Sequence, residues 1–111
     1  MCVAATMPLR REVVLSDRAR AELLRFALEG AHLAGELAGM GGEEDASFRD
    51  AEGHLLAICT GLIDRKGPAY FTGDRDRRYA LRCVIAWAAR RAPRALRREL
   101  RAYAWKVGVY S

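Results

Sequence analysis

Apolar residues recur at helical spacing in four stretches of the chain, and short polar or glycine-rich segments separate them. Ser16 is a good N-cap for a first helix that runs to about residue 40. The segment from Ser47 to Asp50 has the form of a capping box and predicts a second helix that ends near residue 64. A third helix is expected to end near residue 91, and Pro93 suits the first turn of a fourth.

Three short stretches have the pattern of β-strands, namely residues 12–15, 69–72 and 105–110. The first two contain β-branched or aromatic residues, and the third alternates along its length. This order of elements predicts an α/β fold with a small parallel or mixed sheet of about three strands flanked by helices. The length of 111 residues predicts a single domain over residues 1–111, with residues 1–11 as an irregular segment.

Charge is distributed unevenly along the chain. The net charge is +5, but residues 1–53 hold six arginines and ten acids, whereas residues 54–111 hold thirteen lysines and arginines and four acids. The basic half is either a solvated helix face or an anion-binding surface. As an anion-binding surface it would contact RNA or an acidic protein through Arg75, Arg94, Arg97, Arg98 and Arg101.

Cysteine usage and hydropathy indicate the compartment. The cysteines are Cys2, Cys59 and Cys83, an odd number, and the last two fall among apolar residues, which is typical of buried thiols in a reducing environment. The first nine residues carry no charge and arginines follow them, the reverse of a secretory signal, and no apolar run approaches the ~20 residues of a membrane span. We therefore expect a cytoplasmic protein with no membrane partner.

Three segments place acids beside predicted strands and helices. In residues 13–24 a predicted strand is followed by a serine and by a helix with a glutamate six positions after the serine. In residues 50–58 an acid stands at the start of a helix that leads into an apolar run. In residues 71–76 a predicted strand ends in Thr-Gly-Asp, and a second acid follows. In this order they resemble a PIN-domain nuclease, the fold of many toxin ribonucleases of bacterial toxin–antitoxin pairs. The resemblance covers residues 12 to about 85, and nothing upstream of Glu12 supplies the family's first strand and helix.

The resemblance implies metal-dependent cleavage of RNA phosphodiesters by clustered carboxylates. The catalytic and metal-binding set would be Glu22, Asp50, Asp74 and Asp76, with Glu52 as a substitute for Asp50. Such hard oxygen ligands hold Mg²⁺ or Mn²⁺, which activates a water for attack on the phosphorus. The implied partners are RNA and an acidic protein such as an antitoxin, and a homodimer could assemble the site.

A second interpretation needs no catalysis. Asp50 would belong to the capping box, and Glu22 would pair with Arg18. Asp74 and Asp76 would be the N-cap and a first-turn acid that complement the dipole of the next helix. The chain would then be an interaction protein that binds an acidic protein or nucleic acid through its basic C-terminal helical face. A base-stacking residue near the arginines could come from the aromatic residues Trp87, Trp105, Tyr70, Tyr79, Tyr103 and Tyr110.

Overall fold

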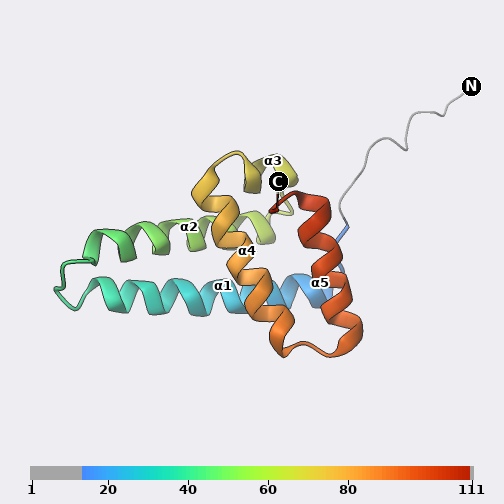
Figure 1. The fold of residues 1–111 in the computed structure, drawn as a ribbon, viewed down its shortest axis with the longest axis horizontal. Helices are drawn as coiled ribbons and strands as arrows, with labels where there is room; N and C mark the ends of the chain where they lie inside the picture. The colour runs from blue at the N-terminus through green and yellow to red at the C-terminus, as the bar shows by residue number, and fades with distance from the viewer. Residues whose placement is uncertain (1–13, 111) are drawn as a thin grey trace, which may run out of the picture.

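The computed structural model describes residues 14–110, and these residues form an all-α fold (Figure 1). The helices are α1 (Asp17–Ala38), α2 (Asp45–Ile63), α3 (Pro68–Thr72), α4 (Arg75–Arg91) and α5 (Arg94–Val107). No strand is present within residues 14–110, so the predicted α/β fold with a three-stranded sheet is wrong. The helical segments, by contrast, are confirmed with boundaries that differ by a few residues.

Two helical hairpins make up most of the molecule. The helices α1 and α2 run side by side, and α4 crosses this pair at an angle and leads into α5 (Figure 1). The loop end of the α1–α2 hairpin extends beyond α4, whereas its other end packs against α5 and the short helix α3. The second hairpin therefore lies across the first, and among residues 14–110 no further helix covers the α1–α2 loop end.

Small residues on α1 allow the helices to approach closely. Six of the eight residues that α1 buries are alanine or glycine, and the other two are large and apolar: Ala19, Ala27, Gly30, Ala31, Ala34, Ala38, Leu23 and Phe26. At the other end of the hairpin, the rings of Tyr70 and Phe71 from α3 press on Gly61 of α2, where an added Cβ would lie 2.6 and 2.7 Å from them. A glycine is therefore needed at position 61 for α3 to dock.

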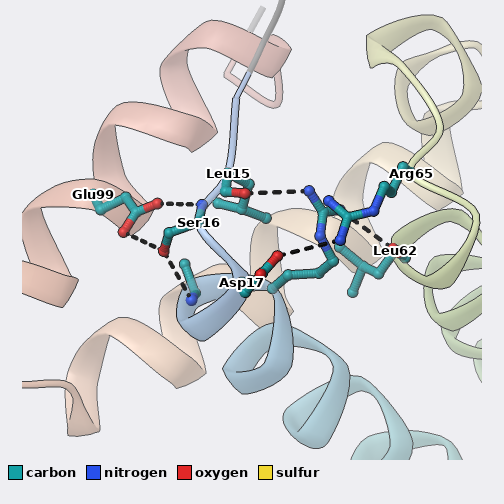
Figure 2. Close-up of polar contacts among 8 residues, drawn as sticks. Leu15, Ser16, Asp17, Leu62, Arg65 and Glu99 are labelled. Atoms are coloured by element: carbon teal, nitrogen blue, oxygen red, sulfur yellow. Dashed lines mark hydrogen bonds and ion pairs between the residues drawn. The ribbon is translucent and has the colours of Figure 1, made fainter.

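A polar network ties the start of α1 to the rest of the fold (Figure 2). The Ser16 hydroxyl caps α1 by accepting from the Ala19 N–H, which confirms the predicted N-cap, and it also donates to Glu99 of α5 at 2.8 Å. Glu99 also accepts from the Ser16 N–H at 2.7 Å. On the other side, the Arg20 guanidinium donates to the carbonyl oxygens of Leu15 and Leu62, so one helix start holds both α2 and α5.

The strand predicted over residues 69–72 is a helix. Pro68 occupies the first helical position, where its missing N–H has no cost, and the Thr72 hydroxyl donates to its carbonyl oxygen. Phe71 is 1% exposed in the core, and the Tyr70 hydroxyl donates to the Ala57 carbonyl. Packing of these aromatic side chains against α2 and α4 overrides their preference for strands.

The strand predicted over residues 105–110 is the end of α5 and its cap. Gly108 ends the helix in the left-handed conformation, with φ of 93°, and the N–H groups of Gly108 and Val109 both bond to the Ala104 carbonyl. This turn returns Val109 to the core beside Val107. The alternating pattern in the sequence therefore comes from a helix cap, in which two apolar residues flank the glycine.

Two further predictions at helix starts have different outcomes. Of the strand predicted over residues 12–15, the described part precedes α1 without strand structure, and the rest lies outside the described residues, as does the predicted irregular segment 1–11. The helix α2 begins at Asp45, two residues before the predicted capping box, so Ser47 does not cap it. Within the described residues, no helix is long and apolar enough to cross a membrane.

Candidate functional site

The four predicted metal ligands do not form one cluster. Glu22 lies on α1, half-buried, where its carboxylate accepts from Arg25 at 3.2 Å rather than pairing with Arg18. Glu52 faces the opposite helix of the same hairpin, because a Cβ added at Gly35 of α1 would lie 2.6 Å from its carboxylate. Both glutamates therefore belong to the α1–α2 hairpin surface.

Asp74 serves as the N-cap of α4. Its Oδ1 accepts from the Asp76 and Arg77 N–H groups at 2.8 and 3.0 Å. The hydrogen bond from the Arg77 amide lowers the pKa of this carboxyl from its ordinary value. The bond from the Asp76 amide and the charges of His54 and Arg77 act in the same direction. The structural interpretation of Asp74 as a helix cap is confirmed.

Asp50 and Asp76 face one groove between α2 and α4. This groove has a volume of about 350 Å³; its walls are mostly apolar, with Tyr79, Val84 and Trp87 from α4, and the two carboxylates lie among its lining residues. The His54 imidazole lies there too, 3.9 Å from the Asp76 carboxylate. Within the described residues, the potential ligand atoms that come within 4.8 Å of one another belong to His54, Asp74 and Asp76, all at or near the surface.

The second hairpin carries an excess of positive charge. From Arg75 to Val107 the chain holds ten arginines and one lysine against two acids. One of these acids, Glu99, is bound to Ser16. Among residues 14–110, every ion pair of an arginine involves Arg25 or Arg65, and none involves an arginine of α4 or α5.

Two of these ten arginines have structural roles. Arg97 donates from Nε to the Ala89 carbonyl and from Nη2 to the Ala92 carbonyl, so it satisfies the end of α4. Arg77 donates to the Tyr70 carbonyl and lies 4.7 Å from the centre of the Tyr70 ring. Arg97, one of the arginines predicted to contact nucleic acid, is half-buried and binds the backbone between α4 and α5.

The remaining α5 arginines share one face of their helix. Arg94, Arg98 and Arg101 lie on α5 at spacings of four and three residues, all exposed, and Trp105 follows four residues later. At about 100° per residue, these four positions fall within a sector of about 60°. Trp105 is 70% exposed and continues the arginine stripe to the end of the helix.

Aromatic contacts join this stripe to the start of α4. The rings of Trp105 and Tyr110 lie 4.9 Å apart, and the Arg82 guanidinium lies 5.1 Å from the centre of the Tyr110 ring. A small cavity of about 180 Å³ opens there, lined by residues of the first half of α4 and the end of the chain: Arg75, Arg78, Tyr79, Arg82, Val109 and Tyr110. We call the continuous surface the arginine–aromatic arc; it consists of Arg75, Arg78, Arg82, Tyr110, Trp105, Arg101, Arg98 and Arg94.

Arg78 and Arg82 were not among the residues predicted from the sequence. Their spacing from Arg75, three and then four residues, matches the helical repeat and was the available signal. The strand predicted over residues 105–110 hid the rest, because it separated Trp105 and Tyr110 from the helix that carries the other arginines of the arc. Comparisons with protein-family models, with curated proteins and with solved structures found no match for this chain.

Proposed function

We propose that this protein binds RNA without cleaving it, through the arginine–aromatic arc. The observation that carries the proposal is that the arc's six arginines form no ion pair with any described residue. Positive charge that a fold does not compensate internally is available for phosphate groups. A guanidinium also donates in a planar fork that matches two phosphate oxygens, which makes arginine well suited to this contact.

The two hairpins carry net charges of opposite sign, and this difference would orient an approaching polyanion. Helices α4 and α5 with the segment between them carry a net +9, whereas the stretch from Asp17 to Ile63 holds nine acids and four arginines, a net −5. A polyanion is attracted to the second hairpin and repelled by the first, so electrostatic steering favours one orientation of approach. The arc lies on the attracting hairpin.

The aromatic members of the arc favour RNA over an acidic protein as partner. Trp105 and Tyr110 expose ring surface directly beside arginines, and nucleic acids offer both a phosphate for the guanidinium and a base for the ring. An acidic protein, such as an antitoxin segment, would use the arginines and has less need of the rings. It remains the second partner class to be tested.

The proposal contains no metal-dependent cleavage step. Asp74 uses one carboxylate oxygen to hold two amides of α4, and Glu22 pairs with an arginine on α1. In the cluster of His54, Asp74 and Asp76 the two carboxylates are exposed, and exposed acidic groups are common in proteins without a metal. For the compartment we propose the cytoplasm, in keeping with Cys59, a buried free thiol whose pKa is raised by burial.

The test is a titration of fluorescently labelled RNA, followed by anisotropy at 0.1 M salt. If each arginine makes one phosphate contact, loss of a contact weakens binding about 5-fold at this salt, so Arg75→Gln/Arg78→Gln/Arg82→Gln should weaken it about 100-fold. Arg49→Gln is the matched control for a single change such as Arg98→Gln, because it removes an exposed arginine from α2, outside the arc. Polyglutamate serves as the acidic-protein probe.

The outcomes separate the alternatives. The proposal is supported if the triple variant weakens RNA binding about 100-fold and Arg98→Gln weakens it about 5-fold, while Arg49→Gln leaves it unchanged. Binding of polyglutamate but not of RNA would replace RNA with an acidic protein as the partner. An RNA affinity that is equal in the wild type and the triple variant would show that the arc is only a solvated face.

A further inference from the structure

The end of α5 presents an aromatic pair that the core does not require. Trp105 and Tyr110 are 70% and 44% exposed, and their rings meet at 4.9 Å with an angle of 45° between the planes. The neighbouring residues Val107 and Val109 are both 3% exposed and supply the apolar packing at this end of the molecule. The exposed rings therefore contribute little to the core and remain available to a ligand.

The helix cap fixes the position of this pair. Gly108 takes the left-handed conformation, and the Val109 N–H bonds back to the Ala104 carbonyl. This turn folds Tyr110 back onto Trp105, five residues earlier, and Val109 anchors it in the core. A pair held by backbone geometry and by a buried neighbour loses little further freedom when a ligand binds.

Positive charge borders the pair on both sides. Arg82 lies over the Tyr110 ring, and Arg75 and Arg78 share the 180 Å³ cavity with it. On the other side, Arg101 precedes Trp105 by one helical turn on the same face of α5. A base on the aromatic pair would thus have guanidinium groups within reach of the phosphates on its two sides.

We infer that the Trp105–Tyr110 pair is a stacking platform that selects single-stranded over double-stranded RNA. The inference rests on the proposed RNA binding and adds the class of substrate. In a duplex, base faces are covered by their neighbours, so the rings find no partner and only the arginines contribute. In a single strand an unstacked base can lie on an exposed ring, and this contact adds to the phosphate contacts.

The test compares three probes of similar charge at 0.1 M salt: an unstructured single-stranded RNA, a blunt RNA duplex and inorganic polyphosphate, which has no bases. Trp105→Leu should weaken binding of the single strand by about 5- to 150-fold, the range for loss of one stacked base. The affinity of Trp105→Leu for the duplex and for polyphosphate should differ from that of the wild type by less than about 2-fold, because neither probe offers an unstacked base. Trp105→Phe keeps a ring and should retain most of the single-strand affinity.

Failure of this inference can be told apart from failure of the proposed function. If Trp105→Leu leaves single-strand binding unchanged, or weakens all three probes equally, the platform is refuted while arginine-dependent RNA binding stands. If the wild type binds no RNA, or the triple arginine variant binds as well as the wild type, the proposed function itself fails. Circular dichroism of Trp105→Leu and Trp105→Phe checks the fold, which the exposure of Trp105 leads us to expect intact.

Discussion

The two hairpins of this protein differ in how many of their charged side chains form ion pairs. On α1, charged side chains compensate one another locally: Arg25 contacts Glu22 and Glu29 at one-turn spacing, and His32 contacts Glu36. On α4 and α5, the exposed arginines have no acidic partner among residues 14–110. Both hairpins are folded helices with apolar inner faces, so the fold tolerates either arrangement of surface charge. The proposed function assigns the counter-charge of the second hairpin to the phosphates of a bound RNA.

The two hairpins nevertheless share one core, so a core substitution in either hairpin should lower the stability of both. Leu23 of α1 and Leu100 of α5 are both fully buried. Replacing either with Ala removes buried methyl groups and leaves a cavity, so each change should lower the free energy of unfolding by about 2–5 kcal/mol. Chemical denaturation followed by circular dichroism should show one transition in each case. Two separate transitions would show that the hairpins fold independently.

Two glycines of the first hairpin should respond differently to a methyl group. In Gly61→Ala the new Cβ meets the Tyr70 and Phe71 rings at 2.6–2.7 Å. We expect the free energy of unfolding to fall by about 1–3 kcal/mol, because α3 must shift. At Gly35→Ala the Cβ meets only the carboxylate end of Glu52, which can swing away. This change should be neutral or stabilising by up to about 1 kcal/mol, because alanine favours the helix.

Equal effects of the two substitutions in thermal melts would contradict the close contact of α3 with α2. The matched design removes the effect of helix propensity, since both glycines lie inside helices of the same hairpin. The RNA affinity should be unchanged in Gly35→Ala.

The link between the hairpins can be measured with Ser16 and Glu99. Ser16→Ala removes the cap of α1 together with the bond from its hydroxyl to Glu99, and should cost about 0.5–2 kcal/mol. Glu99→Gln keeps the shape but weakens the bonds from Ser16. In a double-mutant cycle the two effects should be less than additive, since they share one interaction. Strict additivity would show that the contact contributes nothing to stability.

The smallest effect concerns acid stability and the cap of α4. Bonds from backbone amides lower the pKa of Asp74, so the folded state binds fewer protons than the unfolded state near the ordinary carboxyl pKa of 3.8. The stabilisation is complete above that pH and is lost as the pH falls through the lowered pKa. Asp74→Asn should therefore show a shallower loss of stability between about pH 5 and pH 2 than the wild type. If the stability of Asp74→Asn and of the wild type fell equally over this pH range, the assignment of Asp74 as the cap of α4 would be contradicted.

The helical segments could be predicted because their signals are local. Apolar positions at helical spacing and the caps at Ser16 and Asp74 depend only on nearby residues, and the structure confirms them. The strands predicted over residues 69–72 and 105–110 were wrong because aromatic and β-branched residues prefer strands only when a sheet is available to receive them. At residues 69–72 no such partner lies within the described chain, and packing on Gly61 favours a helix.

The candidate site was only partly predictable for a related reason. Which arginines are free depends on tertiary contacts, and no local pattern distinguishes Arg97, which caps α4, from Arg98, which is exposed. The arc also joins residues of two helices, and the meeting of Arg82 with Tyr110 requires the antiparallel packing of α4 and α5. The charge asymmetry, in contrast, was visible from counts alone.

The most direct test of the account is the salt dependence of RNA binding by the wild type and by Arg75→Gln/Arg78→Gln/Arg82→Gln. Each phosphate neutralised contributes about −0.7 to the slope of log affinity against log salt for a single strand, so six arginines predict a slope of about −4 and the triple variant about −2. A wild-type slope near zero, or the same slope in both proteins, would contradict the claim that the arginines of the second hairpin receive their counter-charge from a nucleic acid.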